Sequence, residues 1–370
     1  MKIASVRAFA YRSPIATPVI ASFGAMRDRP MVLVCVEDQD GAVGWGEIWC
    51  NFPSVGAEYR ARMVEKVLAP LVEGRDADPA QIFSMLLERT AVLAIQAGEP
   101  GPIAQSIAGV DIALWDLAAR RAGVPLWRML GGVDPSVPVY ASGLNPDRPE
   151  QLALERQAEG HTAFKLKVGF GLERDMGNLR ALRDTLGAKA MLMVDANQAW
   201  SPEEAARCAP RLDAFGLRWL EEPMRADMPW PVWQGLARSI GTPLAAGENV
   251  AGAEAFAAAI GSGALGVVQP DIGKWGGFSG CLPVAQRVAA AGLTYCPHWL
   301  GGGIGLVASA HLLAAVPGGV LEIDSNTNPL RSLTCGPVGS VSSGRIRLTE
   351  LPGLGVEADQ AALQEFLSPH

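Results

Sequence analysis

The 370-residue chain lacks any cluster of lysine and arginine, and its formal net charge is −7. A nucleic-acid-binding domain normally presents a basic face, so the composition argues against DNA or RNA as a partner. The sequence also lacks a Walker phosphate loop and a G-x-S-x-G nucleophile elbow. It therefore gives no support to the chemistries that those two motifs carry.

The cysteines form no C-x-x-C pair, and their spacing predicts neither a zinc site nor a disulfide framework. We expect free thiols, which suit a reducing compartment. Arg7 and Arg12 interrupt the apolar run near the N-terminus, so we expect no signal peptide and a cytoplasmic protein. The six cysteines are Cys35, Cys50, Cys208, Cys281, Cys296 and Cys335.

One stretch, residues 296–321, contains no Asp, Glu, Lys or Arg. A membrane-spanning helix needs about 20 apolar residues. Glycines 301–303 and the Pro-Gly-Gly at 317–319 interrupt this stretch at both ends. We therefore predict a short buried helix over residues 304–315 and no membrane segment.

The first third of the chain has the pattern of an α+β domain. Strand patterns near residues 3–11, 31–37 and 42–47 predict a three-stranded meander, with a turn at 38–41. Helical patterns follow near 56–73, 78–96 and 103–122. We assign residues 1–125 to this domain and expect the tail, residues 346–370, to return and complete it.

From residue 137 onwards, short β-rich runs alternate with helix-length segments, which is the period of a TIM-type (β/α) barrel. The G-x-G-x-x-G fingerprint of a doubly wound sheet is absent after the first run. We therefore predict an α/β barrel over residues 126–345. Its eight strands are expected at 137–142, 163–168, 191–197, 219–222, 244–248, 266–271, 294–298 and 320–324.

Carboxylates stand at the ends of three consecutive predicted strands: Asp195, Glu221 and Glu248. In a barrel these ends converge, and three buried acids repel one another unless a cation neutralises them. All-oxygen ligation suits Mg²⁺. We interpret the three acids as a magnesium site rather than as helix caps.

Two lysines, Lys165 and Lys167, share one face of the second strand and point into the barrel. Their repulsion and partial burial are expected to lower a lysine pKa and create a usable base. Asp271 and His298 end neighbouring strands, where the carboxylate can fix the imidazole tautomer. Lys167 and His298 are then expected to flank a substrate from roughly opposite faces.

Two features leave alternatives open. Glu322 ends the eighth strand and either bonds to the substrate or caps the segment 324–328. The glycines 301–303 either present backbone N–H groups to an anion at a helix N-terminus or permit tight packing after a barrel strand.

As an ordered set, these motifs resemble the mandelate racemase-like branch of the mandelate racemase / muconate lactonizing enzyme family, in the enolase superfamily. The resemblance covers essentially the whole chain. The motifs are specific as an ordered set, whereas any one of them alone would be weak evidence. The motifs are Ala113-Leu-Trp-Asp116, Lys165-Leu-Lys167, Val194-Asp-Ala-Asn197, Glu221-Glu-Pro223, Gly247-Glu-Asn249, Asp271-Ile-Gly-Lys274, Pro297-His298 and Glu322.

The resemblance implies a modified, enolase-like barrel under an N-terminal capping domain, with one Mg²⁺ per subunit on Asp195, Glu221 and Glu248. Strand alternation agrees with this ligand set by turning Glu222 away. The remaining roles implied are acid/base chemistry for Lys167 and for His298 with Asp271, enediolate stabilisation for Lys165, and substrate contact for Asn197, Glu322 and Ser142.

The resemblance also implies that two loops of the capping domain cover the site. These are residues 20–26, with Phe23, and residues 49–52, with Trp49 and Asn51, which we list as substrate-binding candidates. Arg27 and Arg29 beside the first loop are candidates for binding a distal carboxylate. The apolar character of both loops favours instead a monoacid or a less hydroxylated ring.

The function implied is removal of the proton next to the carboxylate of a small molecule. We favour dehydration of an acid sugar to a 2-keto-3-deoxy acid. The alternatives are racemisation or epimerisation of a 2-hydroxy acid and cycloisomerisation of a sugar lactone. A non-catalytic binding protein would have lost a ligand or a base, and none is missing. Relatives form dimers to octamers, so we expect a homo-oligomer.

Overall fold

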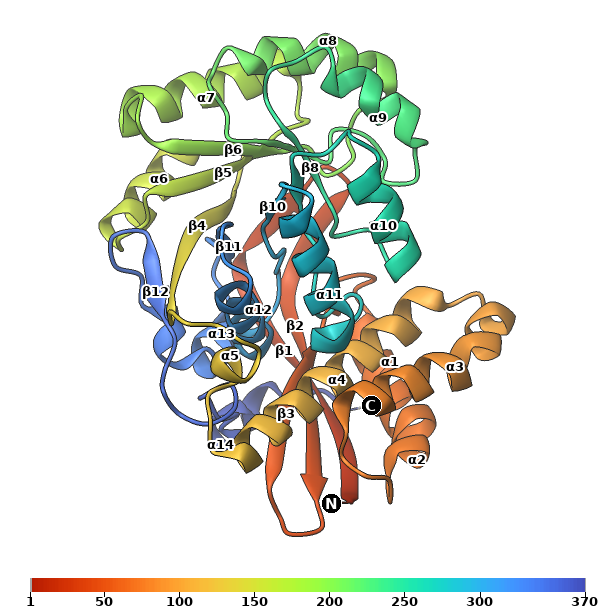
Figure 1. The fold of residues 1–370 in the computed structure, drawn as a ribbon. Coiled ribbons are helices and arrows are strands. Elements are labelled where there is room, and N and C mark those ends of the chain that lie inside the picture. Colours follow the sequence, from red (N-terminus) through yellow and green to blue (C-terminus); the bar gives the residue numbers. More distant parts are fainter. Residues whose placement is uncertain (1, 370) are drawn as a thin grey trace.

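The computed structural model describes residues 2–369. Its N-terminal part is an antiparallel sheet in the order β1 (Ile3–Ala21), β2 (Gly24–Asp38) and β3 (Val43–Ile48). The β1–β2 hairpin is much longer than expected and reaches alongside the barrel (Figure 1). The segment 20–26 is therefore no open loop but the hairpin tip, with only Ser22 and Phe23 in the turn. Pro14, Pro18 and Pro30 mask this strand pattern because proline is atypical of strands.

The predicted helices of this domain are present. The first region contains α1 (Gly56–Met63), a π-helical turn η1 (Val64–Leu68) and α2 (Ala69–Val72), and it is followed by α3 (Pro79–Ala97) and α4 (Pro100–Ala122). Helix α4 packs closely on β3. A Cβ atom on Gly46 would lie 2.0 Å from the Gly109 carbonyl oxygen, so this approach requires glycine.

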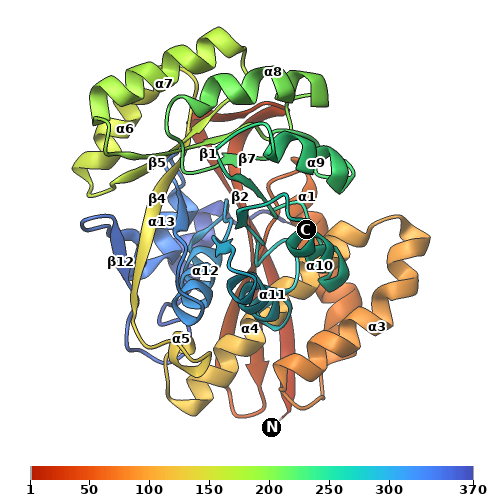
Figure 2. The same cartoon turned by 45° about the horizontal axis from the view of Figure 1, so that its top comes forward.

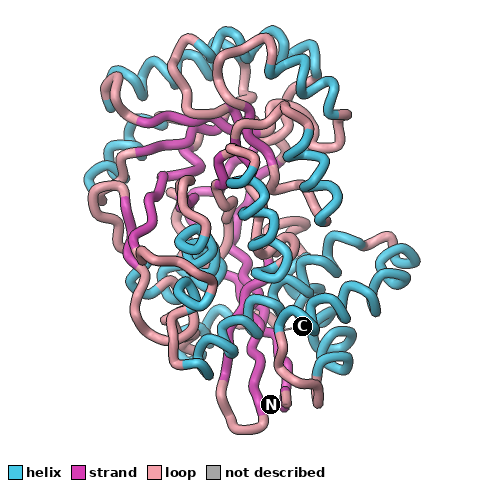
Figure 3. Tube along the Cα trace, in the orientation of Figure 1, coloured by secondary structure: helices cyan, strands magenta, loops and turns pink. Residues whose placement is uncertain are grey.

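The barrel prediction is confirmed. Eight parallel strands lie in the order β10-β9-β8-β7-β6-β5-β4-β11, each within or overlapping one predicted run. The sheet curls inside a ring of helices (Figures 2 and 3). The strands are β4 (Ser136–Leu144), β5 (Ala163–Lys167), β6 (Met191–Asp195), β7 (Leu220–Glu221), β8 (Leu244–Ala246), β9 (Val267–Val268), β10 (Thr294–Tyr295) and β11 (Leu321–Asp324).

Helices follow each barrel strand and cover the outside of the sheet. They are α6 (Pro149–Ala158), α7 (Leu172–Leu186), α8 (Pro202–Asp213), α9 (Trp230–Ala237), α10 (Ala253–Gly261), α11 (Gly277–Ala290), α12 (Gly303–Ala315) and α13 (Pro329–Thr334). Shorter elements are α5 (Leu126–Met129), η2 (Gly336–Gly339), β12 (Arg345–Arg347), α14 (Gln360–Leu363) and η3 (Gln364–Phe366).

The inside of the barrel is filled rather than open. Tyr140 and Trp219 meet edge to face with ring centroids 5.4 Å apart, at the centre of a buried layer contributed by several strands. The other members of the layer are Ala163, Met193, Ala245, Val267 and Cys296. This apolar floor closes the barrel below its polar upper end.

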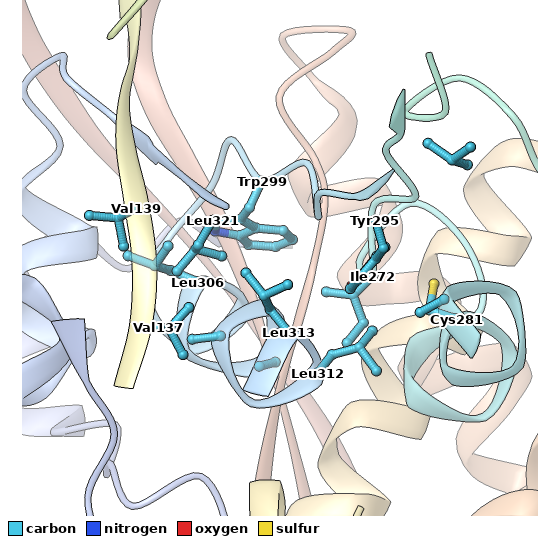
Figure 4. Close-up of a cluster of buried hydrophobic side chains, with 14 of the residues drawn as sticks. Val137, Val139, Ile272, Cys281, Tyr295, Trp299, Leu306, Leu312, Leu313 and Leu321 are labelled. Atoms are coloured by element: carbon cyan, nitrogen blue, oxygen red, sulfur yellow. The ribbon is translucent and has the colours of Figure 1, made fainter. Parts of the chain in front are cut away.

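Helix α12 accounts for the uncharged stretch. It spans nearly the predicted residues and is buried along almost its whole length. Leu306, Leu312 and Leu313 of this helix join Trp299 and Leu321 in the core (Figure 4). Within residues 2–369, no helix is long and apolar enough to cross a membrane. All six cysteines are free and buried.

The C-terminal tail links the two parts of the molecule. Strand β12 pairs with β4 of the barrel. Beyond it, the Leu354 amide donates to Asp116 over 2.7 Å, and the Ser368 amide donates to the Ala10 carbonyl over 2.8 Å. These contacts are those expected of a tail that completes the first domain. The domain limits themselves stay a prediction.

His311 generates a prediction about stability. It is buried in α12, where Nδ1 accepts from the Trp127 amide over 2.8 Å and Nε2 lies 3.1 Å from the Leu354 carbonyl. Burial lowers the pKa of His311 to about 4. The unfolded chain takes up this proton near pH 6.5, so the stabilisation is complete above that pH and is lost as pH falls towards 4. The loss is about 1.4 kcal/mol per pH unit.

The measurement is urea unfolding at pH 7 and pH 5. His311→Gln keeps an acceptor and a donor but cannot titrate, so its free energy of unfolding should fall less steeply with pH than that of the unaltered protein. Equal slopes would show that His311 is not the titrating group.

Candidate active site

Ionisable side chains gather where the parallel strands of the barrel end. Lys167, Asp195 and Glu221 occupy the last positions of β5, β6 and β7, and the strand register pairs Lys167 with Asp195 and Asp195 with Glu221. Glu248, Asp271 and His298 follow β8, β9 and β10, and Glu322 lies in β11. The backbone register therefore brings together side chains that are distant in sequence.

Each lysine of β5 contacts a carboxylate. Lys165 is fully buried, and its Nζ lies 2.6 Å from Glu221 Oε1 and 2.9 Å from Glu322 Oε1. Burial lowers the pKa of Lys165, but Glu221 and Glu322 outweigh it and raise the pKa well above its usual range. Lys167 Nζ lies 2.6 Å from Asp195 Oδ2 and 2.8 Å from Asn197 Oδ1.

Burial lowers the pKa of Lys167 too, but the Asp195 and Glu221 carboxylates together outweigh it and raise the pKa. The expectation of lowered lysine pKa values is therefore wrong for this arrangement of side chains. The Lys165 charge still lowers the pKa of Lys167, but a carboxylate within hydrogen-bonding distance of each ammonium group offsets this repulsion.

The structure brings His298 and Asp271 together. His298 Nδ1 lies 2.6 Å from Asp271 Oδ2, and His298 Nε2 lies 2.5 Å from Glu248 Oε2. The other Asp271 oxygen accepts from the backbone amides of Gly273 and Lys274. Burial lowers the pKa of His298, but Glu248 and Glu322 raise it well above its usual range. The imidazole is therefore held in a fixed orientation and favours its protonated form.

The three candidate metal ligands are buried or nearly so, and each pairs with a cationic side chain: Asp195 with Lys167, Glu221 with Lys165, and Glu248 with His298. Within the described residues, no three such groups are arranged as they would be around one ion. Burial raises the pKa of Glu221 to about 7, and the nearby Asp195 charge adds to the increase. Three carboxylates on consecutive strands give an all-oxygen donor set, whose chemistry fits Mg²⁺.

Glu222 does not face away from this cluster, contrary to the alternation argument. Its backbone has φ of 39°, which ends the strand geometry directly after Glu221. Asn249 Nδ2 donates to both Glu222 carboxylate oxygens over 2.9 Å. Burial and the neighbouring Glu248 and Asp195 charges raise the pKa of Glu222 well above its usual range.

A cavity of about 270 Å³ opens above these groups. Its polar side is lined by Lys167, Asn197, Glu248 and His298, together with Gln198, Asn249 and Lys274. The lid side is apolar and is formed by Val19, Ile20, Ala21, Phe23, Met26, Trp49, Phe52 and Leu300. The Phe23 and Phe52 rings meet edge to face at 5.1 Å and join the two lid segments.

Three candidate substrate contacts, Asn51, Ser142 and Glu322, lie outside this lining. Asn51 is buried, and its amide donates to the Leu300 carbonyl over 2.5 Å, so it fixes the lid segment instead of facing the cavity. Ser142 lies deeper and donates to Glu322. Glu322 also accepts from the Trp299 amide over 3.2 Å. The segment after β11 is held instead by Asp324, which accepts from Asn326.

The candidate distal arginines do not reach the cavity. Arg29 is buried and forms a 2.6 Å ion pair with Asp324, which ties β2 to β11. Arg27 is exposed and is absent from the cavity lining. Among the described residues, no arginine lines this cavity.

The glycines after β10 satisfy both interpretations proposed for them. The Gly302 and Gly305 amides at the start of α12 donate to Glu47 of β3, so a carboxyl group of the chain itself occupies this helix N-terminus. A Cβ on Gly303 would lie 2.2 Å from the Cys335 amide nitrogen, so packing is also tight. Burial raises the pKa of Glu47 to about 8.

Sequence reasoning assigned no role to several residues at the site. Two of them, Lys274 and Asn249, belong to motifs named above. Their position beside the ends of barrel strands is the sequence feature that could have identified them as site residues. Glu47 gave no local signal, because its partners are backbone amides more than 250 positions away.

Residues 3–131 match the mandelate racemase / muconate lactonizing enzyme N-terminal domain, and residues 149–362 match the enolase C-terminal domain-like family. The chain belongs to the mandelate racemase / muconate lactonizing enzyme family of the enolase superfamily. The curated homologues of this family member are enzymes: cycloisomerases, dehydratases, racemases and epimerases.

Three similar proteins illustrate the relationship. A mandelate racemase/muconate lactonizing enzyme from Bordetella bronchiseptica RB50 is 57% identical, with a TM-score of 0.94 over 99% of each chain. A racemase from Streptomyces coelicolor A3(2) with bound magnesium is 34% identical, with a TM-score of 0.90 over 99% and 100% of the chains. The 3,6-anhydro-alpha-L-galactonate cycloisomerase of Streptomyces coelicolor is 34% identical over 96% of this chain and 97% of its own.

Proposed function

We propose that this family member is a Mg²⁺-dependent enzyme that removes the proton next to a carboxylate and then expels an oxygen from the neighbouring carbon. The observation that carries the proposal is the pairing of Lys167 and His298, which end the second and seventh barrel strands and both line the cavity. A substrate in the cavity would lie between them, with a proton-transferring group on each side.

Asp195, Glu221 and Glu248 would hold the Mg²⁺. When bound, the ion supplies positive charge that offsets the charge developing on the substrate carboxylate. The buried Lys165 ammonium adds a fixed positive charge at the same end of the barrel, where water does not screen it. Glu322, held by Ser142 and Lys165, would accept a hydrogen bond from a substrate hydroxyl group.

Lys167 would take the α-proton, and Asn197 would orient its ammonium group through the 2.8 Å hydrogen bond. Lys167 must first lose its own proton, and its raised pKa opposes this loss as long as Asp195 is its partner. Deprotonation would become easier when Asp195 binds the Mg²⁺ instead. His298, oriented by Asp271, would give a proton to the departing oxygen. One C–H and one C–O bond break, and the resulting enol becomes a 2-keto acid.

If the departing oxygen is a hydroxyl group, the reaction is dehydration of an acid sugar to a 2-keto-3-deoxy acid, which we favour. If it is a ring oxygen, the same steps give cycloisomerisation. The apolar lid favours this second candidate, since it suits a ring with few hydroxyl groups, and the 34% identical cycloisomerase supports it. We also propose that the protein assembles into a homo-oligomer, and that the capping domain ends at residue 125 and the barrel at residue 345.

The test is a screen of aldonic acids, aldaric acids, anhydro acids and lactones with Mg²⁺ in D₂O. We expect at least one acid to give a 2-keto product together with deuterium from solvent. Deuterium at the α-carbon without a keto acid would indicate a racemase or epimerase instead. Neither a 2-keto product nor deuterium exchange with any acid would overturn the proposal.

Glu221→Gln tests the metal site. The substitution removes one anionic ligand and should reduce both Mg²⁺ affinity and activity by at least about 100-fold, as measured by calorimetry and turnover. Asp227→Asn, on an exposed acid of the loop that follows β7, is the control and should retain both. Retention of Mg²⁺ affinity in a folded Glu221→Gln variant would rule out this ligand set.

His298→Asn separates the two proton transfers. The variant should form keto acid at least about 100-fold more slowly, because the departing oxygen loses its acid. Lys167 should still exchange the α-proton, so deuterium should enter recovered substrate. Loss of exchange together with turnover would mean that His298, and not Lys167, removes the proton.

A further inference from the structure

Lys274 lines the cavity, yet none of the proposed steps uses it. Among the described residues, the cationic side chains in the lining are Lys167, His298 and Lys274. The first two have proton-transfer roles. Lys274 follows β9, four strands away from Lys167 on β5, and its side chain is 12% exposed. It therefore supplies positive charge to a different part of the cavity.

The Lys274 ammonium is held in place from several sides. Nζ lies 3.0 Å from Asn249 Oδ1, 3.7 Å from Glu248 Oε1 and 4.4 Å from the centroid of the Trp49 ring. A cation at this distance over an indole ring is attracted to its face. Because Trp49 belongs to a lid segment, the ammonium lies at the boundary between the polar side of the cavity and the lid.

The orientation of Asn249 is itself fixed. Its Nδ2 donates to both oxygens of the buried Glu222 and to Glu248 Oε1, so its carbonyl oxygen is left to face Lys274. Glu222, which has no part in the proposed chemistry, thus acts as a positioning residue for Lys274. A backbone hydrogen bond also holds the lid segment beside Lys274, since the Trp49 amide donates to the Gly273 carbonyl over 3.3 Å.

The other lid-side residues offer a substrate few polar contacts. Apart from the aromatic groups, they are Val19, Ile20, Ala21, Met26 and Leu300. A second carboxylate placed among them would lose its hydration without gaining a matched pair of donors. The nearby Glu248 oxygen already offsets part of the Lys274 charge. A neutral oxygen acceptor, in contrast, needs only one donor.

We propose that Lys274 is a specificity-determining residue whose ammonium donates a hydrogen bond to a neutral oxygen in the remote half of the substrate. Lys274 thereby selects monocarboxylic acids that carry a hydroxyl or ether oxygen there over dicarboxylic acids. The inference rests on the proposed function, and it narrows the substrate class of that site.

The test is binding to the Mg²⁺-loaded protein by calorimetry. The probes are the tightest-binding aldonate of a six-carbon set, 2-hydroxyhexanoate, which lacks remote oxygens, and galactarate, a diacid. Lys274→Met should weaken aldonate binding about 10- to 100-fold, since a charge-assisted hydrogen bond is lost, and leave 2-hydroxyhexanoate within about twofold. Lys274→Arg should recover part of the loss. Arg27→Met is the matched control and should bind all three ligands normally.

Three results would overturn the inference: tighter binding of galactarate than of every aldonate, weaker binding in Arg27→Met but not in Lys274→Met, or an equal loss for 2-hydroxyhexanoate. The last result, with reduced Mg²⁺ affinity, would show that Lys274 acts through Glu248. Failure of the proposed function is recognised separately, because the unaltered protein would then give neither a 2-keto product nor α-deuterium exchange with any acid.

Discussion

The buried ammonium group of Lys165 is the interaction on which the upper end of the barrel depends. It lies over the Tyr140 ring at 5.4 Å, has no contact with water, and touches Glu221 and Glu322 from strands on either side. Removing one partner from a buried ion pair costs about 3–5 kcal/mol, because the remaining charge stays unpaired. Lys165 thus sets the positions of the two carboxylates, and the apolar layer beneath keeps water from screening them.

Buried polar contacts also join the capping domain to the barrel. Arg29 of β2 pairs with Asp324 of β11, and Glu47 of β3 accepts the first amides of α12, all within the buried interior. Each contact is satisfied only when the two parts are correctly placed. They therefore fix the β1–β2 hairpin, and with it the lid, relative to Glu322 in β11. The lid is consequently part of the rigid framework except at its tip, where Phe23 is 62% exposed.

The sequence predicted all eight barrel strands because parallel strands are continuous apolar runs that end in a polar residue, as at Lys167, Asp195 and Glu221. The length of the β1–β2 hairpin was missed, since its prolines disguise the pattern. The direction of Glu222 was missed because one positive φ breaks the alternation. Contacts such as Arg29 with Asp324 join residues 295 positions apart, and local pattern carries no information about them.

The division of the cavity into a charged side and an apolar lid separates two properties that can change independently. The charged side is built from side chains at the strand ends, and each of these side chains neutralises the charge of another. A substitution there therefore disturbs several groups at once. The lid is built from side chains that contact few of these groups, so it can change without cost to the charge network. Homologues that share this fold but carry out different reactions are consistent with that separation. Lys274 stands where the two meet, held by Asn249 on one side and Trp49 on the other. A change at this position would alter which remote groups are accepted while leaving the proton-transferring pair in place.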